Sequence, residues 1–491
     1  MKVLVLALML SCAALPSAAQ LVDVQHPNQQ QPANGQQTSG QQSGAPPTQP
    51  QQASPAAVTS AQQVIQQVAT GQFDKVEAQY NARLATALQP GKLAQAWASL
   101  LEQAGSFDSV ASVRSGKVQG YDVVILVCKF QKGLVDAQIA FDVDGKIAGL
   151  RFTGHQEPVP PWVEPSYAKP DSFSEQPLTL VNGAFELPGT LTVPKGDGPF
   201  PAAVLIAGSG PHDEDETIGP NKVLKDLAWG LASHGVVVFR YTKRTQKYGE
   251  KSNADPAKLT VDDETISDAR AAVALLAKQQ KIDPRHIYIV GHSLGAYLAP
   301  RIATSDTEIA GIVMLAANTR PMEQLLVDEI RYLINLGGPS HPPTADEQKQ
   351  FTAVEDSEKQ IESSDLKPGD TVQVLGGTMP ASYWLDLRNY HPVEVANGLR
   401  IPILILQGAR DFQVPPDSNF AEWKSGLAGR RNVEFKLYPN LNHLFMAGSG
   451  PSLPKEYDTP GHVDEPVIVD IAAWISAGGK LPQQSPANGA N

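Results

Sequence analysis

Cysteine, basic residues and long apolar runs are what this 491-residue sequence has little of. Its two cysteines, Cys12 and Cys128, are too few for a disulfide-built scaffold or a multi-cysteine metal site. Acidic side chains (51) outnumber basic ones (39), and the formal net charge of −12 argues against nucleic acid or an anionic membrane as the main partner. No H-E-x-x-H motif and no Walker-type loop occur, so neither a metal nor an organic cofactor is expected. Because 42% of the residues are hydrophobic and only 18% are charged, the chain can bury a full-sized core.

The N-terminal residues have the pattern of a targeting segment. A positively charged start, a short apolar run and small residues up to Ala19 predict a secretory signal at 1–19. The apolar run is shorter than the roughly 20 residues that span a bilayer, so no stable membrane insertion is expected after cleavage. A lipoprotein anchor at Cys12 is the alternative, although the residues before it fit that pattern poorly. The expected location is the periplasm or the outside of the cell.

Composition divides the rest of the chain into segments. A Gln- and Pro-rich stretch has too little apolar surface to offset the entropy of ordering it. It is followed by apolar residues at helical spacing and then by strand-like runs, which predict a small α+β domain whose Cys128 is a core residue rather than a nucleophile. The expected segments are a disordered linker at 20–57, the small domain at 58–155, a Pro-rich connector at 156–172, a large domain at 173–481 and a disordered tail at 482–491.

The large domain alternates strands with helices. Several of its strands are continuous runs of Val, Ile and Leu, as in a mostly parallel sheet covered by helices on both faces. Residues 319–395 break this alternation and predict a helical cap inserted after the sixth main strand. Strands are expected at 178–181, 186–193, 202–206, 236–241, 286–290, 309–315, 403–406 and 433–438, and helices at 222–233, 262–280, 294–304 and 464–476.

A G-x-S-x-G motif at 291–295 lies between an expected strand and an expected helix. This is the context in which the motif forms a nucleophile elbow, a tight turn that exposes the serine hydroxyl. Bulky residues at Gly291 or Gly295 would collide with neighbouring backbone. Ser293 is therefore the candidate nucleophile.

A serine hydroxyl needs a base to remove its proton during attack. Asp411 and His443 each follow an expected strand, so both should lie at the same sheet edge as Ser293. We expect His443 to act as general base and acid, and Asp411 to orient its imidazole. Asp417 competes with Asp411 for this role, although it reads better as a helix-capping residue.

The oxyanion of the reaction needs backbone N–H donors. Leu294, directly after the nucleophile, should supply one. The loop after the third strand should supply the other, with Ser209 the better candidate and Gly210 the next. His212 and Asp213, in the same loop, are expected to brace it rather than to form a second dyad.

Two further clusters leave alternatives open. Arg240, Lys243 and Arg244 could guide an acidic substrate or could form ion pairs with the acidic residues 213–216. In the cap, Tyr383 and Trp384 are expected either to line the acyl pocket or to pack the cap against the sheet.

With these residues in place, the region 172–481 resembles the bacterial α/β-hydrolase superfamily. It is similar to secreted or cell-envelope carboxylesterases whose oxyanion loop reads G-S-G-P followed by acidic residues, a group related to dienelactone hydrolases and serine aminopeptidases. The small domain is similar to a domain of unknown function that often precedes such hydrolases. Ala207 departs from the pattern, since many hydrolases have His there, which affects the expected shape of the oxyanion loop but not the triad. The resemblance implies ester hydrolysis.

The sequence thus predicts a serine hydrolase that cleaves carboxylic esters with small to medium acyl groups through an acyl-enzyme. A serine peptidase or amidase of the same fold is the first alternative, because specificity lies in the cap and pocket rather than in the triad. A catalytically inactive ligand-binding protein is the second. The small domain, which contains no catalytic constellation, is expected to serve docking or substrate presentation.

Overall fold

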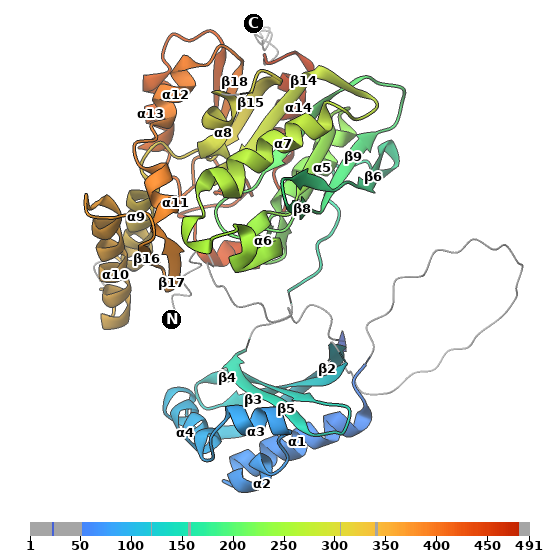
Figure 1. Ribbon diagram of the computed structural model, residues 1–491, viewed down its shortest axis with the longest axis vertical. Coiled ribbons are helices and arrows are strands. Elements are labelled where there is room, and N and C mark those ends of the chain that lie inside the picture. Colours follow the sequence, from blue (N-terminus) through green and yellow to red (C-terminus); the bar gives the residue numbers. More distant parts are fainter. Residues whose placement is uncertain are drawn as a thin grey trace, which may run out of the picture. The chain divides into compact units, whose positions relative to one another are not determined.

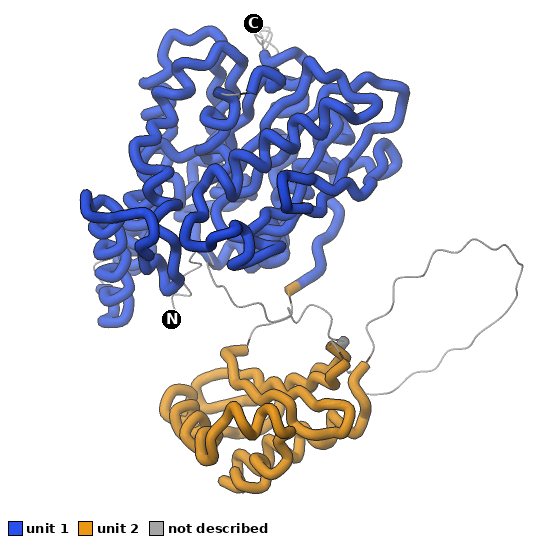
Figure 2. The backbone as a smooth tube through the Cα atoms, in the orientation of Figure 1, with its two compact units in different colours: residues 1–14, 160–491 blue, residues 15–159 orange. Residues whose placement is uncertain are grey.

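The structure is a computed structural model that describes residues 52–480, except 119, 156–158, 305 and 339–341, together with a two-residue strand at Val22–Asp23. The described residues divide into two compact units, one ending at Val159 and the other beginning at Pro160 (Figure 2). Each unit has its own hydrophobic core. The expected signal at 1–19, the expected tail at 482–491 and most of the expected linker lie outside the described residues.

The smaller unit contains an antiparallel sheet with the strand order β1-β2-β3-β4-β5, and four helices lie between β1 and β2 in the sequence (Figure 1). Helix α1 buries Val64, Ile65 and Val68, which recur on one face at helical spacing. Cys128 is buried in β3, where burial and then the charge of Asp136 raise the pKa of its thiol to about 12, so it is not a reactive nucleophile. The elements are β1 (Val22–Asp23), α1 (Pro55–Ala69), α2 (Phe73–Glu77), α3 (Ala82–Ala87), α4 (Lys92–Ala104), β2 (Phe107–Val118), β3 (Tyr121–Phe130), β4 (Gly133–Phe141) and β5 (Ile147–Gly154).

Two features of this unit differ from the sequence-based expectation. Strand β2 was not predicted, because its side chains are mostly small or polar and half-exposed, and it is its pairing along β3 that makes it a strand. Helix α1 begins at Pro55, so the small domain starts before the expected boundary at 58. The Ser54 hydroxyl accepts a hydrogen bond from the backbone N–H of Ala57, and proline is well suited to the first helical turn.

The larger unit is built on an eight-stranded sheet with the order β19-β18-β15-β14-β10-β13-β9-β6. The six strands from β19 to β13 are parallel, and β9 and β6 continue the sheet antiparallel at one edge. Every residue of β13 and β18 is buried, as expected when helices cover both faces. The sheet strands are β6 (Phe173–Pro177), β9 (Gly189–Pro194), β10 (Phe200–Ile206), β13 (Val237–Tyr241), β14 (Ile282–His292), β15 (Ile309–Leu315), β18 (Ile403–Gly408) and β19 (Val433–Tyr438).

The helices around this sheet form two groups: α5 packs with α14, whereas α8 packs with α7 and α12. Their bounds are α5 (Val223–Ser233), α6 (Arg244–Tyr248), α7 (Ser267–Leu276), α8 (Leu294–Thr304), α12 (Pro392–Gly398), α13 (Asn419–Gly426) and α14 (Glu465–Ser476). Two small ribbons add β7 (Leu180–Asn182) with β8 (Phe185–Leu187) and β11 (Thr217–Ile218) with β12 (Asn221–Lys222). Short 3-10 turns lie at Pro170–Ser172, Gly249–Ser252, Pro256–Lys258 and Pro454–Asp458.

Two predictions for the larger unit were wrong in detail. The expected strand at 178–181 is β7, which pairs only with β8, and the edge strand of the main sheet is β6. A sheet edge needs little apolar surface, and β6 buries only Phe173. The expected helix at 262–280 is a π-helical turn, Asp262–Ile266, followed by the shorter α7.

The expected insertion does follow β15, the sixth main strand along the chain. It contains α9 (Met322–Asn335), α10 (Ala345–Glu362), the hairpin β16 (Thr371–Val374) and β17 (Gly377–Pro380), and α11 (Ala381–Leu387), which together we call the cap (Figure 1). The predicted fold class, a mostly parallel sheet with a helical cap insertion preceded by a small α+β domain, is confirmed. Among the described helices, none has the length and apolar character of a membrane span.

Candidate active site

Ser293 lies in the tight turn between β14 and α8. Its φ of 51° falls in the left-handed region, which is strained for a residue with a side chain. A Cβ placed on Gly291 would lie 2.4 Å from the carbonyl carbon of Gly295, and one on Gly295 would lie 2.3 Å from the carbonyl oxygen of Ile206. Only glycine fits both positions. The turn leaves Ser293 partly exposed while its neighbours are buried.

His443 and Asp411 meet at the same edge of the sheet, from the loops after β19 and β18. His443 Nδ1 lies 2.8 Å from Asp411 Oδ2, and both side chains are buried. The other carboxylate oxygen, Oδ1, accepts hydrogen bonds of 2.9 Å from the backbone N–H groups of Gln413 and Val414. Asp417 is exposed ahead of α13, so Asp411 is the carboxylate partner of His443.

His292 connects the elbow to the His443 loop. Its Nε2 lies 2.9 Å from the backbone oxygen of His443, and its Nδ1 lies 3.0 Å from Glu216 Oε1. Both neighbours are acceptors, so both ring nitrogens donate and His292 is an imidazolium. Burial opposes this charge, but Glu216 and the two hydrogen bonds outweigh it and raise the pKa of His292. Burial likewise opposes the charge of Glu216, yet His292 keeps the pKa of that carboxyl below its usual range.

The loop after β10 contains the candidate oxyanion donors. A Cβ on Gly208 would lie 3.2 Å from Ser293 Cβ, which places this loop against the nucleophile. Within the described part of the chain, the backbone N–H groups of Ser209, Gly210 and Leu294 donate to no protein group. These three residues also line one cavity. They are thus the donors that remain free to bind an oxyanion.

His212 and Asp213 brace this loop. His212 Nε2 donates to the backbone oxygen of Ser209 over 2.7 Å, and Asp213 accepts from the backbone and hydroxyl of Thr217. Burial lowers the pKa of His212, which keeps its ring neutral.

Arg240, Lys243 and Arg244 form buried ion pairs rather than an exposed patch. Arg240 binds Asp215, inside the acidic stretch that was expected to supply partners. Lys243 and Arg244 instead pair with Glu264 and Asp268, respectively. Because all three cations are buried and paired, they do not form a surface that guides an acidic substrate.

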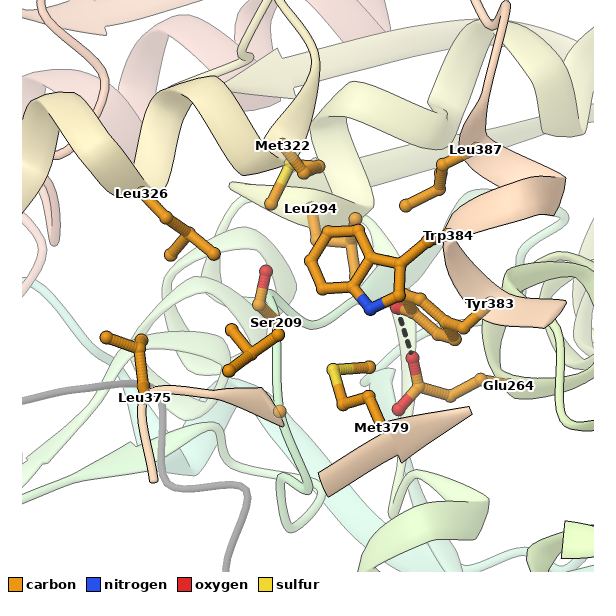
Figure 3. Close-up of a pocket in the computed structure, with 12 residues that line it drawn as sticks. Ser209, Glu264, Leu294, Met322, Leu326, Leu375, Met379, Tyr383, Trp384 and Leu387 are labelled. Atoms are coloured by element: carbon orange, nitrogen blue, oxygen red, sulfur yellow. Dashed lines mark hydrogen bonds between the residues drawn. The ribbon is translucent and has the colours of Figure 1, made fainter. Parts of the chain in front are cut away.

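A narrow cavity of about 40 Å³ extends from the oxyanion loop to the cap. Tyr383 and Trp384 both line it, and the Tyr383 hydroxyl donates to Glu264 Oε2 over 2.9 Å (Figure 3). Burial and then Glu264 raise the pKa of Tyr383 far above its usual range, so the hydroxyl stays a neutral donor. The lining residues are Ser209, Gly210, Glu264, Leu294, Met322, Leu326, Val374, Leu375, Met379, Tyr383, Trp384 and Leu387.

Several buried acidic residues around the site were not identified from the sequence. Glu264 lies on a π-helical turn and Glu329 on the cap helix α9, and Glu216 was seen only as one of four acidic residues in a row. Burial and then the charge of Asp411 raise the pKa of Glu329 to about 8. A π-helical turn often marks a functional site, but nothing in the sequence signals it.

The sheet order, the strained serine turn and the cap insertion define an α/β-hydrolase. Residues 221–448 match the family described as "Serine aminopeptidase, S33", and residues 61–150 match a "Protein of unknown function (DUF3887)". Esterase EstD from Thermotoga maritima is 40% identical over 411 residues, which cover 84% of this chain and 93% of that protein. The chain belongs to the same family as this esterase and is a carboxylic ester hydrolase with a DUF3887 domain at its N-terminal side.

More distant solved structures include Est1E from Butyrivibrio proteoclasticus, 15% identical, covering 62% of this chain and 98% of its own, with a TM-score of 0.41. A puromycin-hydrolysing peptidase from Mycobacterium tuberculosis is 14% identical, covering 77% of this chain and 54% of its own, also with a TM-score of 0.41. The superfamily resemblance read from the sequence is confirmed by the family match and by the EstD relationship.

Proposed function

We propose that the protein hydrolyses short-chain carboxylic esters through an acyl-enzyme, with Ser293 as nucleophile, His443 as general base and acid, and Asp411 as the carboxylate that orients His443. The observation that carries this proposal is the buried His443–Asp411 pair, joined through His292 to the strained turn that presents Ser293. Family membership supports ester hydrolysis, and the geometry supports these three roles.

In the proposed reaction, Ser293 Oγ attacks the ester carbonyl while His443 Nε2 takes its proton. The resulting oxyanion is held by the backbone N–H groups of Leu294 and Ser209, with Gly210 as a further donor. His443 then protonates the leaving alkoxide. Water, activated by the same imidazole, releases the carboxylic acid and restores the serine. Asp411 stabilises the imidazolium that forms in each half of the reaction.

The cavity supports a short acyl chain. Its volume of about 40 Å³ and its mostly apolar lining support a short acyl chain over a long one. The side chains that the cap contributes to the cavity are mostly apolar. Glu264, which lies outside the cap, also lines the cavity, and its carboxylate accepts hydrogen bonds from Tyr383 and Thr245. Acetate and butyrate esters are therefore the substrates to test first.

The deciding experiment is hydrolysis of p-nitrophenyl acetate and butyrate by the wild-type protein and by Ser293→Ala. Removing the nucleophile should lower kcat by several orders of magnitude, about 10⁶ by analogy with other triads. Ser425→Ala, on the exposed side of α13, is the matched control and should keep wild-type turnover. Wild-type turnover in Ser293→Ala would refute the proposal.

Amide hydrolysis is the second candidate function, and the match to the serine aminopeptidase family over 221–448 favours testing it. Aminoacyl p-nitroanilides, compared with short esters in the same preparation, distinguish the two activities. A larger kcat/KM on the anilides would make the protein a peptidase with esterase side activity. If a folded sample hydrolyses neither substrate and does not react with a serine-directed phosphonate, an inactive ligand-binding protein becomes the better interpretation.

We also propose that the protein is exported by the signal at 1–19 and acts in the periplasm or outside the cell. The charge and apolar pattern of that segment supports this location. Sequencing the N-terminus of protein recovered from a bacterial envelope fraction tests it, with Gln20 as the expected first residue. A lipid-modified Cys12 at the N-terminus would show the lipoprotein alternative instead.

A further inference from the structure

The peptide that links Gly208 to Ser209 is held by a buried lysine. Lys243, which follows β13, donates from Nζ to the carbonyl oxygen of Gly208 over 3.0 Å. In a trans peptide the C=O of one residue and the N–H of the next point in opposite directions. A lysine that fixes the Gly208 carbonyl on one side of this peptide therefore fixes the direction of the Ser209 N–H on the other.

The other end of Gly208 is held as well. Its N–H donates to Glu216 Oε1 over 2.6 Å, and the same oxygen accepts from the His292 imidazolium. Gly208 is thereby excluded as an oxyanion donor, because its own N–H is engaged. Both the N–H and the carbonyl of Gly208 are therefore hydrogen-bonded. The N–H of the next residue, Ser209, has no protein acceptor among the described residues.

Lys243 is itself held in place from the cap side. It is buried, and its Nζ lies 3.4 Å from Glu264 Oε1. Glu264 also accepts from the hydroxyls of Thr245 and Tyr383, at 2.9 Å each. A continuous chain of contacts therefore runs from the cap residue Tyr383 through Glu264 and Lys243 to the Gly208 carbonyl.

We propose that Lys243 is a positioning residue that orients the Ser209 N–H as an oxyanion donor, and that the Glu264–Tyr383 contact holds Lys243 in the geometry this requires. The inference rests on the proposed function and adds to it the source of the donor's orientation. A donor that already points at the developing charge needs no reorganisation during the reaction, which is the condition under which oxyanion stabilisation is most effective. Lys243 acts through the peptide and does not touch the substrate.

The test is Lys243→Met, which removes the donor and keeps most of the aliphatic chain. We expect kcat, normalised to active sites titrated with a fluorophosphonate, to fall about 10- to 100-fold, less than the roughly 10²–10³ lost with a whole oxyanion donor. KM should change by less than about three-fold, because the ester binds before the oxyanion forms. Inhibition by an alkyl boronic acid, whose tetrahedral adduct mimics the intermediate, should weaken by about the same factor as kcat/KM.

A second variant distinguishes the loss of the Lys243 bond to Gly208 from the cost of leaving Glu264 buried without a counter-ion. Lys243→Met alone leaves Glu264 without its counter-ion and can fold poorly for that reason. The double variant Lys243→Met/Glu264→Gln removes both charges and keeps the hydrogen-bonding shape of residue 264. The double variant should have a higher Tm than Lys243→Met, while its kcat should stay as low as that of Lys243→Met. The matched control, Arg244→Met/Asp268→Asn, neutralises the neighbouring buried ion pair, which does not touch the oxyanion loop, and should keep kcat within about three-fold of wild type.

The outcomes are distinct. If the double variant folds and its kcat per active site is within about three-fold of wild type, Lys243 is only a structural residue and the inference is wrong. Ser293→Ala is measured in the same assay. Activity that survives this change would refute the proposed function, and the inference with it. If Ser293→Ala is inactive while the Lys243 variants are fully active, the inference about Lys243 is refuted and the proposed function stands.

Discussion

Among single residues near the site, Glu329 of helix α9 has an unusual ionisation. Gln413 joins it to the Asp411–His443 pair, since its side-chain amide lies 3.3 Å from Glu329 Oε1 and its backbone N–H binds Asp411. Burial, followed by the charge of Asp411, raises the pKa of Glu329 from 4.5 to about 8. The carboxyl is therefore mostly protonated at neutral pH. Above pH 8 its ionisation would place a second negative charge beside Asp411 and favour the protonated imidazole, which cannot act as a base.

Replacing this residue by the neutral isostere, Glu329→Gln, should change the pH dependence of both stability and rate. With a folded pKa above the unfolded one, the stability contributed by the protonated carboxyl is full below about pH 4.5, declines as pH rises and is gone above about 8. The Tm of Glu329→Gln relative to wild type should therefore rise between pH 5 and pH 9, by at least about 2 °C. An alkaline decline in wild-type kcat/KM should flatten in the variant.

Thermal melts and pH–rate profiles measure these effects. Glu362→Gln, at an exposed position of helix α10, is the control and should follow wild type at every pH. If the melting temperatures of Glu329→Gln and wild type stay parallel from pH 5 to pH 9, Glu329 ionises normally and does not influence the Asp411–His443 pair.

Among the structural elements, the cap helix α11 contributes Tyr383, Trp384 and Leu387 to the lining of the cavity. It is attached to the segment that leads into the π-helical turn of Glu264: the Ser382 hydroxyl donates to the backbone oxygens of Ala257 and Leu259, and the backbone N–H of Asp262 donates to Asp386. These contacts fix Tyr383 and Trp384 against the cavity. The rigid attachment of α11 explains how a helix of seven residues can present two large side chains in a defined position.

Truncating both aromatic residues should therefore enlarge the cavity rather than merely loosen the cap. Tyr383→Ala/Trp384→Ala should move the acyl-chain preference towards longer esters, with kcat/KM on p-nitrophenyl octanoate rising relative to acetate. About ten-fold in this ratio is expected if the enlarged cavity buries about two further methylenes, since each contributes about 0.8 kcal/mol. Leu336→Ala, at the exposed C-terminal end of α9, should leave the ratio unchanged. An unchanged ratio in the double variant would show that these side chains only pack the cap.

The elements also show which parts of the site could be predicted from the sequence. Ser293 was identifiable because its turn is specified by residues 291–295 alone, between an apolar strand and a helix. Asp411 and His443 were identifiable because each follows an apolar strand, and parallel strands end at one sheet edge. Their contact in the structure is the geometry that those positions imply.

What could not be predicted depends on contacts between distant segments. Lys243 was seen as part of a basic cluster, but its bond to Gly208 and its pairing with Glu264 join three separate loops. Strand β6 has no apolar pattern because it lies at the sheet edge, and β2 is a strand through its pairing with neighbouring strands rather than through its own pattern. Spacing along the chain does not encode these interactions.

In the whole molecule, the two units have separate hydrophobic cores, and the boundary between them lies before the Pro-rich connector ends. Trp162, within that connector, donates from its indole nitrogen to Asp226 over 2.9 Å and packs edge-to-face on Trp229. Tyr167 is buried in the core of the larger unit. The connector from Pro160 onward is therefore part of the hydrolase fold, whereas the expected domain began at 173.

Two truncations test this division and the role of the smaller unit. A protein that begins at 159 should keep the Tm of the larger unit, because it retains the whole core of that unit. Its turnover of p-nitrophenyl butyrate should stay within about two-fold of that of the full chain. A protein that begins at 173 should melt several degrees lower, because it lacks Trp162 and Tyr167, and a loss of about 1–3 kcal/mol is expected for each large apolar side chain removed from a core. Equal melting temperatures for the two would contradict the assignment of the connector.

If the smaller unit serves docking or substrate presentation, the protein that begins at 159 should lose binding to envelope material or turnover of macromolecular esters, while it still hydrolyses soluble substrates. Unchanged turnover, stability and binding would show that it has neither role.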